Sequence, residues 1–438
     1  MTGEATRMDD ETKAAPGGGA GREDRTAWFV HDRFGMFIHW GIYAIPARGE
    51  WVRNKEKISN EAYQPYFEEF NPIRYDPRRW AALARRAGQK YAVMTAKHHD
   101  GFCLFDSKLT DYKATNTPAR RDLIREYVEA FRAEGLKVGF YYSLLDWHHP
   151  HYPVDHLHPM RENEALKAEK RDFSKYVEYL HGQVRELLTN YGRIDVMWFD
   201  FSYGEMSGEK WRATELVKMV RSLQPHIIID NRLVAGHEDP GKSPIAGDFA
   251  SPEQIIPAEG VTDSSGRPCL WEACITINDN WGYARDDRNF KSPAQLVRML
   301  VECVSKGGNL LLNVGPTALG EIQPEFVERL EAVGRWMDAN SESIYGCTSA
   351  GLPKPEWGRY TRKGKTLYAH IMEKPVGPIA LLGLGGKIKK ARMLYDGSEV
   401  SISRPWNVGE NTKDCFMNLP HTTLPDPIDT VVALELAE

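Results

Sequence analysis

The stretch RDLIREYVEAFRAEGLKVGFYYS, residues 121–143, shows the unit from which the fold is built. Apolar side chains recur at helical spacing over Arg121–Glu134, and Gly135 is a typical helix-end residue. Val138–Ser143 then forms a short β-prone run. A helix that leads through a glycine into a strand is typical of α/β proteins, in which each helix returns the chain to the next parallel strand.

The same alternation extends in both directions, from Trp28 to about Tyr345. Eight β-prone runs are separated by longer amphipathic stretches, so we predict a (β/α)8-like barrel over residues 26–345. The predicted strands are Met36–Trp40, Tyr91–Thr95, Val138–Ser143, Val196–Phe199, Ile227–Asp230, Ile245–Phe249, Leu270–Ile275 and Asn309–Val314. The other predicted helices include Phe173–Asn190, Thr214–Leu223, Pro293–Ser305 and Pro324–Asn340.

Both ends of the chain differ from this pattern. Residues 1–25 are small, polar and charged, and we expect a disordered leader without the apolar run of a signal peptide or membrane helix. Residues 346–438 contain short β-prone segments without helices between them, which predicts a small C-terminal antiparallel β-sandwich. The segments are Thr366–Ile371, Ile379–Leu382, Lys390–Leu394 and Thr430–Leu436.

Composition narrows the class of protein. The 438 residues carry a formal net charge of −5 and no basic stripe, which argues against nucleic acid as a partner, and no segment indicates a membrane partner. Six cysteines without a C-x-x-C pair favour free thiols and a cytoplasmic location. No phosphate-binding glycine loop follows a strand, so we expect no cofactor. The composition is also compatible with a homo-oligomer of this chain.

In a parallel barrel, functional residues lie at the carboxyl ends of the strands. Nearly every predicted strand here ends in polar or aromatic residues that an apolar core would not select. They include His39 and Trp40, Lys97 to Asp100, Tyr141 and Tyr142, Trp198 and Asp200, Asp230 and Arg232, and Asp248 followed by Glu253. We therefore expect one site at this end of the barrel.

Two carboxylates at these positions suit glycoside hydrolysis. That reaction needs one ionised carboxylate to attack the anomeric carbon and one carboxylic acid to protonate the leaving group. Asp200 follows the apolar run Ile194–Phe199, and Glu253 lies beyond the weak strand that ends at Phe249. Taken singly, each has an ordinary alternative, since Asp200 could cap a helix and Glu253 could be a surface glutamate.

Four motifs in order resemble glycoside hydrolase family 29, the α-L-fucosidases. They are FGMFIHWG at residues 34–41, KHHDGF at 97–102, WFD at 198–200 and GGNLLLNVGP at 307–316. The resemblance implies that Asp200 is the nucleophile and Glu253 the acid/base, with Glu238, Glu259 and Glu272 as weaker rivals. It also implies sugar contacts from His39, Glu50, Trp51, His98, His99, Tyr141, Trp198 and Arg232.

The resemblance predicts an exo-acting, retaining α-L-fucosidase that releases terminal fucose from α-L-fucosyl glycosides or oligosaccharides by double displacement. Two alternatives stay open. The His148–His158 loop contains five histidines and could support a metal-assisted hydrolase, and a non-catalytic fucose-binding protein would keep the same pocket. The linkage, the aglycone and the balance between hydrolysis and transfucosylation are not predicted.

Overall fold

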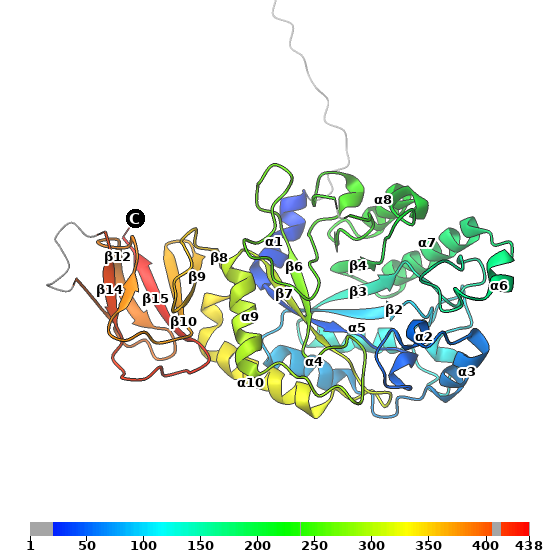
Figure 1. Cartoon of the computed structure of the whole chain (residues 1–438), viewed down its shortest axis with the longest axis horizontal. Coiled ribbons are helices and arrows are strands. Elements are labelled where there is room, and N and C mark those ends of the chain that lie inside the picture. The colour runs from blue at the N-terminus through cyan, green and yellow to red at the C-terminus, as the bar shows by residue number, and fades with distance from the viewer. Residues whose placement is uncertain (1–20, 237, 405–412, 438) are drawn as a thin grey trace, which may run out of the picture.

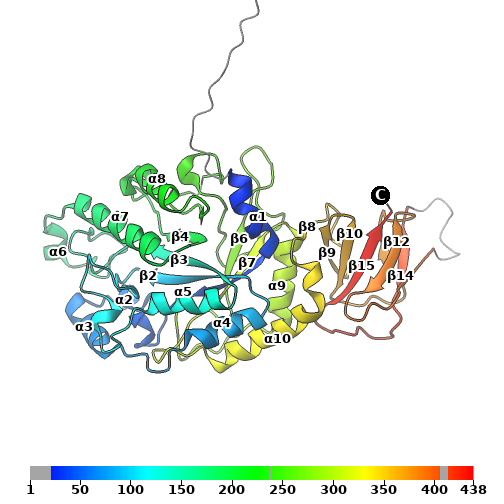
Figure 2. The same ribbon diagram turned by 180° about the vertical axis from the view of Figure 1, so that it is seen from behind.

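The computed structural model describes residues 21–236, 238–404 and 413–437. It contains a larger α/β unit and a smaller β unit that packs on one side of it (Figures 1 and 2). In the described part of the chain, no helix is long and apolar enough to cross a membrane.

The α/β unit is built on a seven-stranded parallel sheet with the strand order β5-β4-β3-β2-β1-β7-β6. Seven of the eight predicted strands are confirmed, with ends that differ by a few residues. The strands are β1 (Phe34–Ile38), β2 (Tyr91–Lys97), β3 (Lys137–Ser143), β4 (Val196–Asp200), β5 (Ile228–Ile229), β6 (Glu272–Thr276) and β7 (Asn309–Val314).

The prediction of an eighth strand at Ile245–Phe249 is wrong. Pro244–Ala246 is a short 3-10 helix, which begins at a proline that has no N–H to pair with a neighbouring strand. Gly247 follows with φ of +72°, and its Cα packs so closely on the Asp230 carbonyl that a Cβ would lie 2.1 Å from that oxygen. The chain therefore turns sharply here instead of extending as a strand.

Single parallel bridges take the place of the missing strand. Asp230 pairs with Phe249 beside β5, and Ala250 with Trp271 and Glu253 with Cys274 beside β6. Residues 249–253 thus touch both edges of the sheet, and the pairing of 250–254 with 270–274 is interrupted at Pro252, which has no N–H to donate. The predicted barrel is confirmed only as a seven-stranded parallel sheet whose edges are linked by these bridges.

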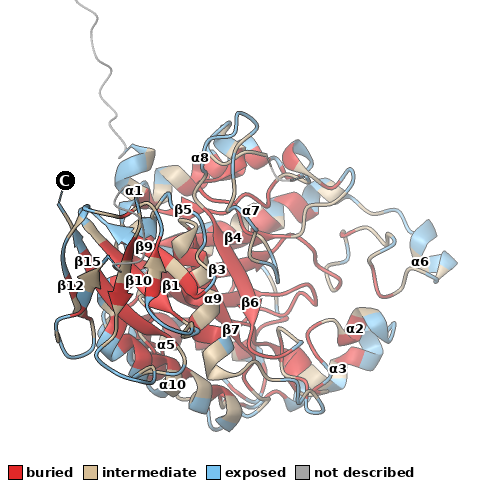
Figure 3. Ribbon diagram, turned by 60° about the vertical axis from the view of Figure 1, so that its left-hand side comes forward, coloured by how far each residue is buried: buried red, intermediate tan, exposed pale blue. Residues whose placement is uncertain are grey.

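The two faces of the sheet are buried in different ways. Phe37 and Trp198 belong to an inner cluster, which also holds Val93, Tyr141, Val196 and Leu311. Their neighbours in the chain, such as Met36 and Met197, belong to the outer cluster that packs against the helices. This alternation follows from the two-residue period of a strand. Figure 3 shows the strands as the most deeply buried part of the unit.

Helices cover the outer face of the sheet (Figure 1). α4 packs against α5 and α10, α7 against α8, and α9 against α10. The helices are α1 (Arg22–Asp32), α2 (Val52–Lys55), α3 (Asn60–Glu69), α4 (Pro77–Arg86), α5 (Leu123–Ala133), α6 (Glu164–Ala168), α7 (Phe173–Asn190), α8 (Ala213–Leu223), α9 (Pro293–Ser305) and α10 (Pro324–Asn340).

Helix α1 crosses the predicted boundary between leader and barrel at residues 25 and 26. It begins at Arg22, and Arg25 pairs with buried Asp248 at 2.8 Å. Arg22 donates to the Asp248 carbonyl at 2.7 Å, and Phe29 belongs to the inner cluster. Residues 22–25 are therefore part of the folded unit, and the predicted leader otherwise lies outside the described residues.

The C-terminal unit is antiparallel, as expected. One sheet has the order β12-β15-β10-β9-β8 and the other β11-β14-β13. The strands are β8 (Thr348–Ser349), β9 (Gly358–Lys363), β10 (Thr366–Ile371), β11 (Ile379–Leu381), β12 (Ile388–Met393), β13 (Ser401–Ser403), β14 (Cys415–Asn418) and β15 (Thr430–Leu436). The unit has its own apolar core and docks on α9 and α10, where Trp336 donates to the Asp429 carbonyl at 3.0 Å.

Candidate active site

A small pocket of about 40 Å³ opens at the carboxyl ends of the parallel strands. Its lining comprises Phe37, His39, Trp51, His98, His99, Tyr141, Trp198, Asp200, Phe201, Arg232, Glu253, Cys274 and Trp281. Nine of the ten predicted site residues are in this set, and Glu50 is not.

Asp200 is the last residue of β4 and is almost fully buried. The Tyr141 hydroxyl, on neighbouring β3, donates to its Oδ2 at 2.6 Å. Burial and the adjacent Asp200 raise the pKa of Tyr141 well above its usual value, so the phenol keeps its proton. Arg232 Nη1 donates to Oδ1 at 2.9 Å. Both Asp200 oxygens thus accept hydrogen bonds from fixed donors.

Arg232 also joins the second carboxylate to the first. The same Nη1 donates to Glu253 Oε2 at 2.8 Å. The two acceptor oxygens are therefore no more than about 5.7 Å apart, the sum of the two contact distances. Burial works to lower the pKa of Arg232, but the negative charges of Asp200 and Glu253 outweigh it and raise that pKa above its usual value.

The two carboxylates differ in their surroundings. The side chain of Asp200 is 10% exposed and that of Glu253 is 43% exposed. Arg232 is the one hydrogen-bond partner of the Glu253 side chain among the described residues. A buried, doubly held carboxylate beside a half-exposed, singly held one is the asymmetry that distinct chemical roles require.

Three buried histidines supply neutral polar groups. Burial lowers the pKa of His39 to about 3 and the pKa values of His98 and His99 well below their usual range. His39 Nδ1 contacts Asn313 Oδ1 at 2.7 Å, and His99 Nδ1 contacts Ser143 Oγ at 2.6 Å. The other nitrogen of each ring can donate or accept one hydrogen bond, which suits a sugar hydroxyl.

Aromatic rings form much of the remaining wall. Trp198 packs beneath Arg232, whose guanidinium carbon lies 4.4 Å from the indole centroid. Phe37, Phe201, Cys274 and Trp281 also line the pocket and were not predicted. Phe37 could have been found, because it lies two residues before His39 on the same face of β1. Trp281, on the loop after β6, carries no comparable signal.

Two predicted or rival carboxylates lie outside the pocket. Glu50 is buried and accepts a hydrogen bond from the Gly282 N–H at 2.8 Å, so it holds the loop that carries Trp281. Glu272, a rival for the acid/base role, is buried inside the sheet and accepts from the Tyr91 hydroxyl. Burial raises the pKa of Glu272 to about 7. Neither group lines the pocket.

Contacts within the protein hold the histidine-rich loop in place. Asp146 accepts from the main-chain N–H of His148 and His149, at 3.0 and 2.8 Å, and from Lys97 Nζ at 3.0 Å. The His148 ring stacks on Tyr112 at 3.8 Å between centroids. Across residues 21–236, 238–404 and 413–437, no three His, Cys, Asp or Glu side chains are grouped as metal ligands. The loop therefore offers no ligand set for a metal-assisted hydrolase.

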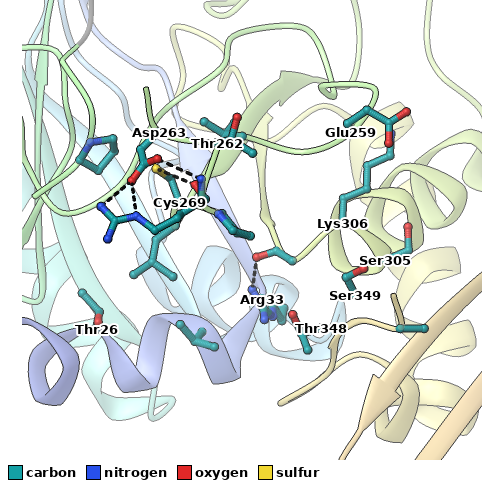
Figure 4. Close-up of a pocket in the computed structure, with 18 of the residues that line it drawn as sticks. Thr26, Arg33, Glu259, Thr262, Asp263, Cys269, Ser305, Lys306, Thr348 and Ser349 are labelled. Carbon is teal, nitrogen blue, oxygen red and sulfur yellow. Dashed lines mark hydrogen bonds and ion pairs between the residues drawn. The ribbon is translucent and has the colours of Figure 1, made fainter. Parts of the chain in front are cut away.

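A larger groove of about 1750 Å³ lies at the opposite ends of the strands, between α1, the 258–270 loop and β8. Figure 4 shows Arg33, Asp263, Cys269, Lys306 and Thr348 around it. Its charged groups pair with one another, as in the 2.9 Å contact between Arg267 and Asp263. Asp200 and Glu253 do not line it, so the smaller pocket is the candidate active site.

Two unlike carboxylates beside neutral imidazoles and aromatic rings define a glycoside hydrolase site. The family model described as Alpha-L-fucosidase matches residues 16–342. The chain is 32% identical to human plasma alpha-L-fucosidase over 82% of this chain and 78% of that protein. The chain therefore belongs to the α-L-fucosidases, glycoside hydrolase family 29.

Solved structures agree with this membership. Alpha-L-fucosidase isoenzyme 1 from Paenibacillus thiaminolyticus has a TM-score of 0.93 and 62% identity, and covers 95% of this chain and 100% of its own. A GH29 alpha-L-fucosidase from Bacteroides thetaiotaomicron has a TM-score of 0.84 and 31% identity, over 97% and 98% of the two chains. That structure is a trapped covalent intermediate, obtained with 2-fluoro-fucosyl fluoride and a glutamate-to-glutamine mutant.

Proposed function

We propose that this α-L-fucosidase is exo-acting and retains anomeric configuration, with Asp200 as nucleophile and Glu253 as acid/base. The observation that carries the proposal is the shared contact with Arg232, which holds the two contacting carboxylate oxygens no more than about 5.7 Å apart before a sugar enters. Retaining glycosidases hold their carboxyl groups about 5–5.5 Å apart, and inverting ones about 6.5–9.5 Å. The small pocket supports attack on a single terminal residue.

The reaction then proceeds in two displacements. Asp200 attacks the anomeric carbon as the bond to the aglycone breaks, and Glu253 gives its proton to the departing oxygen. The product is a β-linked fucosyl ester of Asp200. In the second step Glu253 takes a proton from water, the water oxygen displaces Asp200, and α-L-fucose leaves with its original configuration.

Arg232 contacts both carboxylates, and the two contacts have different consequences for the reaction. Its contact with Asp200 stabilises the carboxylate that attacks and later departs. Glu253 must be protonated for the first step, and a protonated carboxyl cannot form an ion pair. We infer that the incoming sugar separates Glu253 from Arg232, which the 43% exposure of the glutamate side chain allows.

The proposal also covers the course of the reaction, the barrel fold, the substrates and the location. The trapped covalent intermediate of the Bacteroides relative supports double displacement. The bridges that link both edges of the sheet support an incomplete (β/α)8-like barrel. α-L-Fucosyl glycosides or oligosaccharides are the proposed substrates, and the six free cysteines support the proposed cytoplasmic location.

The stereochemical course tests the mechanism directly. Proton NMR of the sugar released from an aryl α-L-fucoside should show the α-anomer first, before mutarotation. First release of the β-anomer would mean a single displacement by water and would overturn the assignment of Asp200 as nucleophile.

A further inference from the structure

Both carboxylates are followed by a residue in an unusual backbone conformation. Phe201, after Asp200, has φ of +81°, and Gln254, after Glu253, has φ of +58°. Residues other than glycine rarely occupy this region, because the side chain is strained there. Such a conformation persists only where surrounding contacts hold it, and the contacts around Gln254 are well defined.

Around Glu253 the chain pairs with β6 as a parallel strand would. The Cys274 N–H donates to the Pro252 carbonyl at 3.1 Å, and the Gln254 N–H donates to the Cys274 carbonyl at 3.0 Å. In a continuous parallel ladder, the next bond would run from the Thr276 N–H to the main-chain carbonyl of Gln254. The positive φ at Gln254 turns the chain away before that bond can form.

The side chain of Gln254 replaces the missing ladder bond. The Thr276 N–H donates to Gln254 Oε1 at 3.3 Å. The amide nitrogen of Gln254 donates to Thr276 Oγ1 at 3.0 Å. Thr276 is buried and belongs to β6, whereas Gln254 is exposed. The Gln254 amide therefore anchors the chain to the buried strand β6, at the point where the chain leaves the sheet.

We propose that Gln254 is a positioning residue for the acid/base, and this inference rests on the role proposed for Glu253. Arg232 holds the Glu253 side chain in the unliganded pocket. Once the sugar separates that pair, the main-chain position of Glu253 is set by its pairing with Cys274 and by the Gln254 amide. A small displacement of the carboxyl group would weaken proton transfer to the leaving oxygen.

The test uses the dependence of rate on the leaving group. The full chain with Gln254→Ala loses both contacts, whereas Thr276→Val loses only the contact with the threonine hydroxyl and keeps the main-chain N–H. Against a dinitrophenyl α-L-fucoside, which departs without protonation, kcat/KM should stay within about twofold of the parent. Against an α-L-fucosyl oligosaccharide, kcat/KM of Gln254→Ala should fall by about tenfold or more, up to the 10²–10⁴-fold that general acid catalysis contributes, and that of Thr276→Val should fall less.

Two further variants make the result decisive. Thr276→Ser keeps the hydroxyl and should keep the parent rate on both substrates. Gln254→Gly relieves the positive φ without restoring the amide, so recovery by glycine would show that strain, and not the contact, governs the rate. Equal losses on both substrates, or no loss on either, in variants with the parent Tm would also overturn the inference.

The acid/base variant separates the two levels of the proposal. Glu253→Ala should show the same leaving-group selectivity more strongly than Gln254→Ala. If Glu253→Ala lacks that selectivity, the role of Glu253 is wrong and the inference falls with it. If Glu253→Ala is selective and Gln254→Ala is not, only the positioning role of Gln254 is wrong.

Discussion

Asp200 and Glu253 share one nitrogen of Arg232 yet differ in burial, and this difference predicts how each responds to removal. Without Asp200 no covalent route exists, so Asp200→Ala should lose about three orders of magnitude or more in kcat/KM on every substrate. Glu253→Ala should keep activity on an activated aryl fucoside and lose it on oligosaccharides. Steady-state kinetics on both substrate types check this.

Azide distinguishes the two variants further. With Glu253→Ala, azide should attack the β-linked fucosyl-enzyme and yield the α-fucosyl azide. With Asp200→Gly, it can attack only the substrate itself, from the vacated face, and should yield the β-azide. A Glu253→Ala enzyme that cleaves oligosaccharides at nearly the parent rate would place the proton donor on another residue.

Glu272 gives a second prediction at the level of a single residue. Its pKa is raised by burial from 4.5 to about 7 in the folded state. Between these values the folded protein binds the proton and the unfolded chain does not, so stability falls as pH rises through this window. The loss reaches roughly 3 kcal/mol above pH 7, at 1.36 kcal/mol for each unit of pKa.

The Glu272→Gln variant cannot ionise and should lack this loss. The Tm of Glu272→Gln relative to the parent should therefore rise as the pH increases from about 4.5 to 7. Because Glu272 does not line the pocket, the variant should keep the leaving-group dependence of the parent. A Tm difference that does not change with pH would contradict the raised pKa.

At the scale of elements, Gly247 forms the turn that brings residues 249–253 to the sheet. An alanine there would place its Cβ 2.1 Å from the Asp230 carbonyl, at φ of +72°. Gly135 has a similar φ of +75° but no atom within 4 Å of an added Cβ. Gly135→Ala should cost about 1 kcal/mol in the free energy of unfolding, from backbone strain alone.

Gly247→Ala should cost clearly more than Gly135→Ala, because the Asp230 main chain must move as well as the turn. It should also lower kcat/KM, since Glu253 is attached to the displaced segment. Urea unfolding and kinetics of the two variants make the comparison. Equal costs for the two alanines would show that the close packing on Asp230 does not constrain the turn.

The contacts of helix α1 predict how far the N-terminus can be shortened without loss of stability. Removing residues 1–20 should leave Tm and kcat/KM unchanged. Removing residues 1–25 deletes Arg22 and Arg25, and buried Asp248 then keeps only Arg221 as a charged partner. We expect Tm to fall by at least about 2 °C in thermal unfolding. Identical Tm values for the two truncations would contradict the role given to α1.

At the scale of the whole molecule, the C-terminal β unit lies against α9 and α10 of the α/β unit (Figure 2). Tyr368, Val431 and Ala433 belong to the apolar cluster that packs outside the parallel sheet. Arg298 of α9 also donates to the Ile428 carbonyl at 3.1 Å. The C-terminal β unit thus contributes side chains to the apolar core of the α/β unit.

Deleting residues 346–438 should therefore expose this apolar surface on α9 and α10. We expect the shortened chain to aggregate or to lose cooperative unfolding, measured by size-exclusion chromatography and calorimetry. A monomeric shortened chain with the parent kcat/KM would show that the catalytic unit folds without its neighbour.

The sequence by itself determined the seven strands, the helices between them and the ends of strands where functional groups gather. These features are encoded locally, in apolar periodicity and in residues such as Gly135 and Asp200 that mark the end of an element. The antiparallel character of the C-terminal unit was predictable for the same reason.

Only the tertiary structure decided how the acid/base segment joins the sheet. The bridges of Phe249 and Glu253, the amide of Gln254 on Thr276 and the nitrogen shared through Arg232 all link residues that are distant in sequence. Such contacts depend on which elements become neighbours, and local periodicity carries no record of that. The hydrogen bond from the Gly282 N–H to Glu50 is another contact of this kind, and the predicted sugar contact of Glu50 stays a prediction.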